Sequence, residues 1–210
     1  MDIKLENVSK KYGDKTIFSS LSFTFKENKI TCLMGPSGIG KTTLVRMIAG
    51  LTPFQGNITK PNAISYIFQE ARLINNLTVY ENLDYVIKNI YKDKNERKQI
   101  IENTLKKVEL LEYASFYPNQ LSGGMAQRVS IARAFIYPSS LLIMDEPFKQ
   151  LDEELRTKVI KEFLKLLKEN KKTVIYITHD IEEAKLLTNN IYIIKNESEI
   201  TKNNKQKNLI

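Results

Sequence analysis

Cysteine, proline and glycine are scarce in this chain. Its 210 residues include one cysteine, six prolines and eight glycines. This composition excludes a disulfide-stabilised scaffold, a collagen-like repeat and a low-complexity chain. The cysteine, Cys32, lies within the apolar run 30–34, so we interpret it as a buried small side chain in a reducing compartment. The length suffices for one sizeable core and predicts a single domain over residues 1–210.

Long apolar runs are also absent. The sequence has no stretch of roughly 18 consecutive apolar residues, so it predicts no transmembrane helix. The opening segment, Met1 to Glu6, carries charges where a secretory signal needs an apolar stretch. We therefore expect the protein to be cytoplasmic, or to be held on the cytoplasmic face of a membrane by a partner.

Acidic residues are outnumbered by basic ones. The chain has 32 lysines and arginines against 24 acidic residues, a formal net charge of +8. A basic chain can bind nucleic acid or an anionic membrane surface. Here the lysines are scattered and form no stripe with aromatic residues, so we interpret them as a solvated surface and predict no nucleic-acid partner. Residues 197–210 form a polar tail. We expect its stretch from Glu197 to Lys207 to be frayed.

The hydrophobic pattern predicts an alternation of strands and helices. Half-buried antiparallel strands are expected at 3–8 and 21–25, and buried strands at 30–34, 141–144 and 173–178. Shorter strands are expected at 56–59, 63–68 and 191–194. Helices are expected at 42–49, ended by Gly50, and at 124–136, 153–168 and 181–187. From Thr78 to about Pro118 the pattern is helical, with no convincing strand.

This order of elements predicts an α/β fold with a mainly parallel sheet. The core would comprise about 1–74 and 139–196, and would include an N-terminal antiparallel β subdomain. The stretch 75–138 would form an inserted α-helical subdomain. In open parallel sheets, ligands bind beyond the carboxyl ends of the strands. Polar residues follow all three buried strands, so we expect a single site fed by those strand ends.

A glycine-rich segment follows the first buried strand and precedes a helix. Residues 35–42 read Gly-Pro-Ser-Gly-Ile-Gly-Lys-Thr, the pattern of a phosphate-binding loop in the required strand-to-helix context. Glycines let backbone N–H groups approach phosphate oxygens, and the helix start adds its positive dipole end. Lys41 would reach the β- and γ-phosphates of ATP, and the Thr42 hydroxyl would bind Mg²⁺. The predicted nucleotide-binding residues here are Gly35, Pro36, Ser37, Gly38, Ile39, Gly40, Lys41, Thr42 and Thr43.

The other two buried strands end in Asp145-Glu146 and in His179. Asp145 is suited to orient Mg²⁺ through its water shell. Glu146 could polarise an attacking water, and His179, the only histidine in the chain, could contact the γ-phosphate. Each has a structural alternative, because a strand-terminal acid pair often caps a loop and a lone histidine is often structural. Their pairing with a phosphate loop favours the functional interpretation.

Further segments carry a family resemblance. Residues 121–128, Leu-Ser-Gly-Gly-Met-Ala-Gln-Arg, resemble the signature motif of ATP-binding cassette (ABC) proteins. They lie between the phosphate loop and Asp145, in the order that this family uses. Gln69, just after a strand, resembles the family's Q-loop, and Tyr12 resembles the aromatic residue that stacks on adenine. The resemblance runs from Leu5 to Ile194 and implies the fold of a P-loop NTPase with a RecA-like core.

The resemblance also implies how the site is completed. In this family two nucleotide-binding domains associate head to tail around two ATP molecules. Ser122, Gly123 and Gly124 would then contact the nucleotide that the partner domain holds, and Asp152 would belong to the D-loop. The resemblance implies that Gln69 senses Mg²⁺, that Glu146 is the general base and that His179 is the switch residue. Family members usually carry small residues just before the Leu-Asp of the D-loop, where this chain has Lys149 and Gln150.

Other stretches resemble importer ATPases of the nitrate, sulfonate, taurine and thiamine-precursor type. They are Pro147-Phe148, residues 178–184 and residues 72–82. This resemblance implies an ATPase subunit that powers an importer of a small anion or organic solute. Its partners would be integral membrane permease subunits, a second copy of the chain in a homodimer with ATP bound, and an extracytoplasmic substrate-binding protein.

Two alternatives stay open at this point. One is a non-transport ABC ATPase that drives a membrane partner mechanically, as in cell division or lipoprotein release, although those relatives usually have threonine where this chain has Phe148. The other is an ATP-binding module without enzymatic competence, which the presence of Lys41, Asp145, Glu146 and His179 disfavours.

Overall fold

The structure is a computed structural model that describes residues 1–149 and 151–203. The chain divides into two compact units. The sheet unit comprises Met1–Tyr66, Ser140–Glu146 and the chain from Lys171 onward, and the helical unit comprises Ile67–Ser139 and Pro147–Asn170. Among the described residues, no helix is long and apolar enough to cross a membrane. Gln150 and the end of the predicted tail, residues 204–210, lie outside the described residues.

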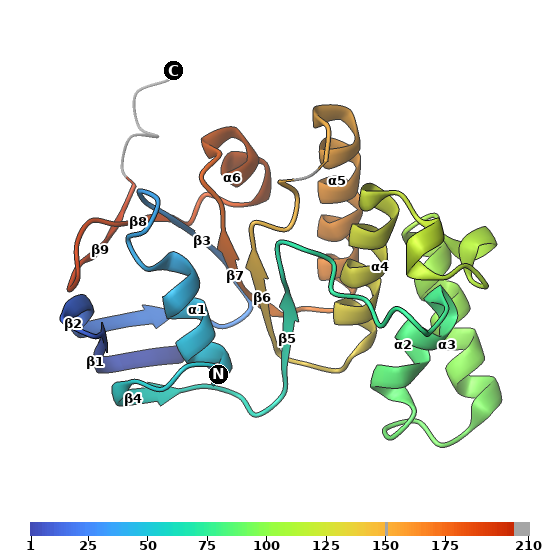
Figure 1. The fold of residues 1–210 in the computed structure, drawn as a ribbon, viewed down its shortest axis with the longest axis horizontal. Helices are drawn as coiled ribbons and strands as arrows, with labels where there is room; N and C mark the ends of the chain where they lie inside the picture. The colour runs from blue at the N-terminus through green and yellow to red at the C-terminus, as the bar shows by residue number, and fades with distance from the viewer. Residues whose placement is uncertain (150, 204–210) are drawn as a thin grey trace. The chain divides into compact units, whose positions relative to one another are not determined.

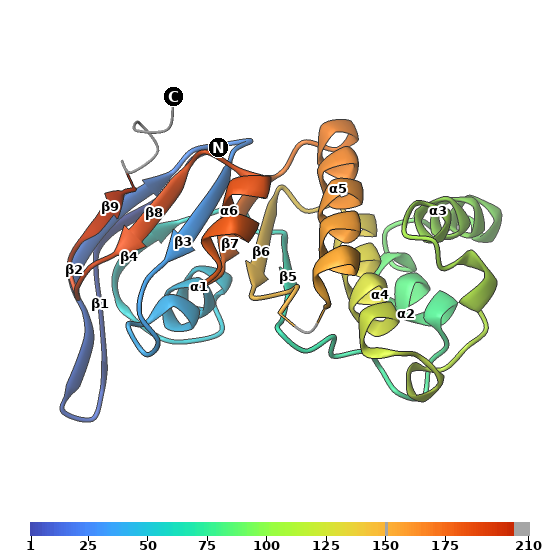
Figure 2. The same cartoon turned by 90° about the horizontal axis from the view of Figure 1, so that it is seen from above.

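The sheet unit contains a three-stranded antiparallel sheet in the order β2-β1-β4. Its strands are β1 (Ile3–Tyr12), β2 (Lys15–Phe25) and β4 (Gln55–Thr59), and β1 pairs antiparallel with both neighbours (Figure 2). On β1, Ile3 and Leu5 alternate with exposed residues and are fully or almost fully buried, and Val8 is buried after a shift in register, which is the pattern of an irregular strand with one face on a core. The antiparallel strands expected at 3–8 and 21–25 are therefore confirmed, and both are longer than predicted.

The larger sheet has six strands in the order β5-β6-β7-β3-β8-β9 (Figure 1). They are β5 (Ile64–Ile67), β6 (Leu141–Asp145), β7 (Thr173–Ile177), β3 (Ile30–Met34), β8 (Ile191–Ile194) and β9 (Ile200–Lys202). Strands β6, β7, β3 and β8 are parallel, so the mainly parallel sheet is confirmed. Every residue of β6 and β7 is buried, as expected of central parallel strands. Cys32 on β3 is buried and free, as predicted.

Among its described residues, the sheet unit has two helices, α1 (Lys41–Ala49) and α6 (Ile181–Leu187). The apolar side of α1, including Leu44 and Ile48, joins a core cluster with residues of β1, β2, β6 and β7. Gly50 ends α1 in a left-handed conformation with φ of 79°, and its N–H bonds to the carbonyls of Arg46 and Met47. This confirms the predicted helix end, since glycine adopts that conformation without steric cost.

The tail was expected to be frayed, and for residues 200–202 this expectation is wrong. They form β9, which pairs antiparallel with β8. Backbone N–H groups of Lys195 and Asn203 donate to the carbonyls of Glu199 and Ile191, at 3.0 and 2.8 Å. Ile200 packs against the apolar core. A single apolar residue and backbone pairing are thus enough to order a segment whose composition is polar.

The helical unit contains no strand among its described residues apart from the end of β5, which confirms the helical prediction for 78–118. Its elements are α2 (Val79–Ile87), α3 (Lys94–Lys107), the 3₁₀ turns η1 (Leu111–Tyr113) and η2 (Pro118–Gln120), α4 (Gly123–Ile136) and α5 (Glu153–Glu169). Helices α4 and α5 lie side by side (Figure 1). The rings of Phe135 and Phe163 pack edge to face between them, with centroids 5.4 Å apart. The helix α5 falls within this unit, whereas the predicted division counted it with the core. That division stays a prediction.

Candidate functional site

The glycine-rich loop between β3 and α1 needs its glycines. Gly35, Gly38 and Gly40 all have positive φ, of 151°, 76° and 106°. A Cβ on Gly40 would lie 2.6 Å from Cγ2 of Ile17, and one on Gly35 would lie 3.0 Å from the carbonyl oxygen of Ile194. The loop is therefore shaped by backbone conformations and close approaches that side chains would not permit.

Lys41 begins α1 and is almost fully buried, with 8% of its surface exposed. Its Nζ donates to the carbonyl oxygens of Gly35 and Pro36, at 2.8 and 2.9 Å. The ammonium group is thus held against the loop that precedes its own helix. The first turn of α1 has no acidic residue, so the positive charge of Lys41 and the helix dipole both favour an anion there.

Asp145 ends β6 and is 8% exposed. Its Oδ1 accepts a hydrogen bond from the Thr42 hydroxyl and its Oδ2 accepts one from the Tyr66 hydroxyl, each at 3.2 Å. Burial raises the pKa of Asp145 above its ordinary value, while the two hydroxyl donors act in the opposite direction. The Asp145 carboxylate and the Thr42 hydroxyl oxygen, 3.2 Å apart, are oxygen ligands of the kind that Mg²⁺ prefers. Proteins bind this ion through one or two carboxylates together with substrate phosphates.

Glu146 follows Asp145 in a left-handed conformation, with φ of 47°. Its N–H donates to the carbonyl of Ile177, the last residue of β7, at 3.0 Å. Oε1 of Glu146 lies 3.4 Å from Nδ1 of His179, and the histidine side chain is 60% exposed against 17% for the glutamate. The contact with His179 thus involves a glutamate whose backbone lies in the left-handed region. Left-handed non-glycine residues of this kind concentrate at functional sites.

The sheet brings these groups to one edge. Strands β3, β7 and β6 are adjacent and parallel (Figure 1), so the phosphate loop, Glu146 and His179 all follow carboxyl ends on the same side. Five sequence-predicted residues therefore gather here, although their chemical roles stay predictions. They are Lys41, Thr42, Asp145, Glu146 and His179.

Tyr12 is the last residue of β1 and opposes Lys15 across the hairpin. Half of its surface is exposed, and Nζ of Lys10 lies 4.6 Å from its ring centroid. An exposed ring of this kind can stack on a flat base, and a cation already lies on it. The adenine-stacking role of Tyr12 stays a prediction.

The remaining predicted site residues belong to the helical unit. Ser122 is the N-cap of α4, where its hydroxyl accepts from the N–H of Met125 at 3.3 Å, and Gly123 beside it is exposed. Gly124 lies close to α5, because a Cβ there would be 2.7 Å from Cδ2 of Leu155. Asp152 is the N-cap of α5. Gln69 lies exposed in the bend after β5, and Lys149 is exposed, whereas Gln150 is outside the described residues.

A set of polar residues that the sequence pattern did not predict fixes the segment 68–78 to α2 and α4. Gln127 of α4 donates to the carbonyl of Phe68 at 3.3 Å. Arg133 of α4 donates to the carbonyls of Ala71 and Arg72, at 3.3 and 2.9 Å, and to Oδ1 of Asn82 at 3.3 Å. A sequence signal existed, because Gln127 and Asn82 stand at helix positions that the periodicity assigns to the buried side.

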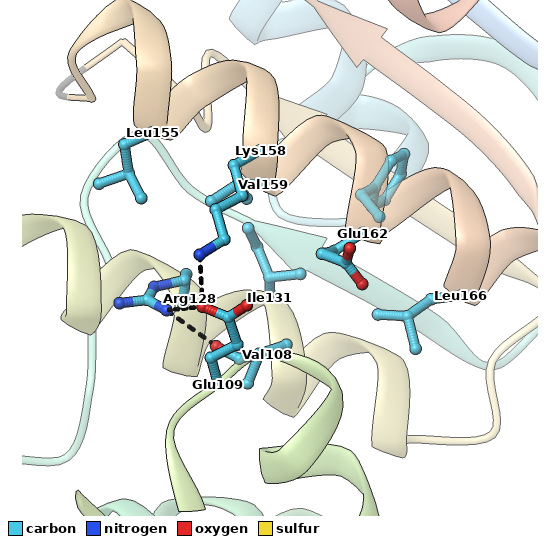
Figure 3. A pocket seen from close by; sticks show the side chains of 10 residues that line it. Val108, Glu109, Arg128, Ile131, Leu155, Lys158, Val159, Glu162 and Leu166 are labelled. Carbon is cyan, nitrogen blue, oxygen red and sulfur yellow. Dashed lines mark hydrogen bonds and ion pairs between the residues drawn. The ribbon is translucent and has the colours of Figure 1, made fainter.

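A separate small pocket lies in the helical unit (Figure 3). Its lining is mostly apolar, with Ile131 of α4 and Val159 of α5 among the residues. At its rim, Glu109 lies 2.7 Å from Nζ of Lys158 and 3.9 Å from Nη1 of Arg128. None of the sequence-predicted site residues lines it. The described residues also contain no cluster of three or more acidic, histidine or cysteine side chains that could hold a metal.

Comparison with known proteins gives consistent matches. The family described as ABC transporter matches residues 18–149. The chain is 38% identical to the Fe(3+) ions import ATP-binding protein of Fusobacterium nucleatum, over 93% of this chain and 56% of that protein. It is 37% identical to the aliphatic sulfonates import ATP-binding protein of Granulibacter bethesdensis, over 92% of this chain and 79% of that protein. The chain thus spans little more than half of the first relative's length.

Among solved structures, the chain resembles a dimeric bacterial ABC transporter cassette. The TM-score is 0.83 with 31% sequence identity, over 95% of this chain and 98% of that one. A second structure of that cassette matches equally well and is a dimeric post-hydrolysis state bound to ADP and Pi.

Proposed function

This chain belongs to the ABC transporter family, and on that premise we propose that it is the ATP-binding and ATP-hydrolysing subunit of a membrane transporter. The fold class predicted from the sequence is confirmed by the same likeness: an ABC cassette with a phosphate-loop core, an antiparallel β subdomain and helices. The observation that carries the proposal is the meeting of Lys41, the Thr42–Asp145 pair and the Glu146–His179 pair at one sheet edge.

ATP would bind with its phosphates in the loop 35–43. Positive-φ glycines expose backbone N–H groups there, and Lys41 is the buried cation beside them. Mg²⁺ would be held by Thr42 and Asp145 together with phosphate oxygens, and when bound it neutralises charge on the phosphates. The oxygen donors present fit that ion, as their hydrogen bond at 3.2 Å indicates.

Hydrolysis requires a water to lose a proton as it attacks the γ-phosphate. Glu146 is our candidate base, because its carboxylate is mostly buried yet lies beside the exposed His179. His179 would contact the γ-phosphate and hold Oε1 of Glu146 in place. The products would be ADP and phosphate, the pair that the related cassette structure holds.

A homodimer would complete the site. The related cassette is dimeric, and α4 begins with a serine cap and two glycines, a second place where helix N–H groups can meet a phosphate. In this arrangement Ser122, Gly123 and Gly124 contact ATP held by the partner copy. Asp152 would belong to the D-loop, and Gln69 would sense Mg²⁺, as the family resemblance implies.

We further propose that the transporter is an importer of a small anion or organic solute. The relatives named above are import ATP-binding proteins, for Fe(3+) ions and for aliphatic sulfonates, and this chain covers 79% of the sulfonate protein against 56% of the iron protein. Relatives of nearly equal identity thus serve different cargoes, which is expected if cargo is selected by other subunits. Those would be integral membrane permeases and an extracytoplasmic substrate-binding protein, with this chain on the cytoplasmic face of the membrane.

The catalytic part of the proposal is tested by phosphate release from Mg-ATP. The wild-type protein should release phosphate, and Lys41→Ala should lower the rate by roughly 10²- to 10³-fold, the usual cost of one lost transition-state contact. Lys161→Ala, at an exposed position on α5, is the matched control and should leave the rate unchanged. Equal rates for wild type and Lys41→Ala would contradict the proposed site.

The transport part is tested by purifying the tagged protein from detergent-solubilised membranes of its host and identifying bound proteins by mass spectrometry. A multi-span permease is the expected partner, with a substrate-binding protein in the complex. A cell-division or envelope-remodelling membrane protein would instead support the mechanical alternative. Recovery without any membrane protein would contradict both.

A further inference from the structure

Tyr66 is joined to the predicted metal site by its hydroxyl. It lies on β5, the strand next to β6 in the larger sheet. Its hydroxyl donates to Oδ2 of Asp145, whereas Thr42 donates to Oδ1, both at 3.2 Å. The two oxygens of one carboxylate therefore have different donors, from β5 and from α1.

The ring of Tyr66 holds that hydroxyl in place. It is half-buried and packs against the apolar core of the sheet unit, so the phenol cannot swing freely. A terminal carboxylate has a broad rotational preference about its last bond, and a fixed donor at one oxygen removes much of that freedom. The other oxygen, Oδ1, is then directed to Thr42.

Restraining the Asp145 carboxylate matters for binding Mg²⁺. The ion demands near-ideal octahedral geometry and gives up its waters reluctantly. Groups that hydrogen-bond to a metal ligand from behind orient it, and their loss typically costs 10- to 100-fold in metal affinity or activity.

We propose that Tyr66 is a positioning residue for Asp145, and that its hydroxyl presents the carboxylate to the divalent cation that accompanies ATP. The inference rests on the proposed function, because it takes Asp145 and Thr42 as the residues that hold the cation. A role in fold stability alone would affect unfolding and leave cation binding unchanged, so the two can be separated by measurement.

The test is the affinity of Tyr66→Phe for a non-hydrolysable ATP analogue, measured by titration calorimetry in EDTA and again with Mn²⁺ as the probe cation. The variant keeps the ring and loses only the hydroxyl. We expect its affinity in EDTA to match wild type, while the gain in affinity on adding Mn²⁺ falls by about ten-fold or more. Tyr85→Phe, at an exposed tyrosine of α2, is the matched control and should behave as wild type.

If Mn²⁺ raises the affinity of Tyr66→Phe for the ATP analogue as much as it does in wild type, the inference is overturned and the proposed function stays intact. If Mn²⁺ does not raise the affinity of the wild-type protein for the ATP analogue, the metal site itself is overturned. This outcome is seen in the wild-type titrations alone, so it is distinguishable from a failure of the inference about Tyr66. Circular dichroism and thermal melting establish that the variant is folded. If Tyr66→Phe does not fold, Tyr66→Met also lacks the donor and has a flexible apolar side chain that adapts to the space left, and the same fall in the affinity gained from Mn²⁺ is expected of it.

Discussion

Replacing Asn82 by alanine should destabilise the helical unit, because this side chain bonds to five groups while fully buried. Its Nδ2 donates to the carbonyls of Ile74, Leu77 and Thr78, at 3.1, 3.1 and 3.0 Å. Its Oδ1 accepts from the N–H of Ile74 at 2.9 Å and from Arg133 at 3.3 Å. Asn82 thus closes the segment 74–78 onto the first turn of α2.

The magnitude follows from which groups lose their last partner. The carbonyls of Ile74 and Thr78 keep backbone N–H donors, from Leu77 and from residue 82 itself. Arg133 keeps the carbonyls of Ala71 and Arg72. The N–H of Ile74 and the carbonyl of Leu77 both lose the partner that Asn82 supplies, at about 1–3 kcal/mol for each unsatisfied group. The sum is about 4 kcal/mol, which for a chain of this size lowers Tm by about 8–16 °C.

The assay is urea unfolding followed by circular dichroism, with thermal melting as a second measure. Asn76→Ala is the matched control, because Asn76 lies exposed in the same segment and should change the unfolding free energy by less than about 0.5 kcal/mol. A loss below about 1 kcal/mol in Asn82→Ala would refute the reasoning, since it would mean that solvent or a neighbour satisfies the freed groups.

Three further substitutions have definite expected outcomes. Gly40→Ala should lower the unfolding free energy by about 2 kcal/mol and abolish ATP binding, because φ is 106° and the new Cβ would meet Ile17 and Phe18; urea unfolding and calorimetry check this. Asp145→Asn should melt higher than wild type at pH 7. Burial raises the pKa of Asp145 in the folded protein, so the wild-type protein loses stability as the pH rises and the carboxyl ionises. The higher melting temperature of Asp145→Asn should therefore vanish below pH 3.8, where the acid is protonated in both the folded and the unfolded state. Tyr12→Ala should weaken ATP binding by about 1–3 kcal/mol if its exposed ring stacks on adenine, and unchanged binding in calorimetry would make Tyr12 a turn residue.

The central sheet could be predicted because its strands are continuous apolar runs that end in polar residues. Residues 141–144 and 173–177 are buried throughout, and a continuous apolar run predicts a strand that is buried on both faces. The same reasoning placed Asp145 and His179 at one edge, since parallel strands end on the same side. The phosphate loop could be predicted from its sequence pattern between a strand and a helix, because Gly35, Gly38 and Gly40 adopt positive φ values that glycine tolerates best.

Other features depend on partners that are distant in sequence. The hydrogen bond from Tyr66 to Asp145 joins residues 79 positions apart, and Tyr66 has no local pattern that distinguishes it from a packing residue. The ordering of β9 depends on pairing with β8, which its polar composition does not reveal. The left-handed φ of Glu146 is equally hidden, because glutamate is not a residue type that favours this conformation.

The most direct test of the central claim, that this sheet edge hydrolyses ATP with Glu146 as the base, is the rate of phosphate release by Glu146→Gln. The amide preserves size and removes the proton acceptor, so the rate should fall by roughly 10²- to 10³-fold while Mg-ATP binding is retained. Glu197→Gln, an exposed control in the same unit, should release phosphate at the wild-type rate. Near-normal turnover by Glu146→Gln would contradict the account and exclude Glu146 as the base.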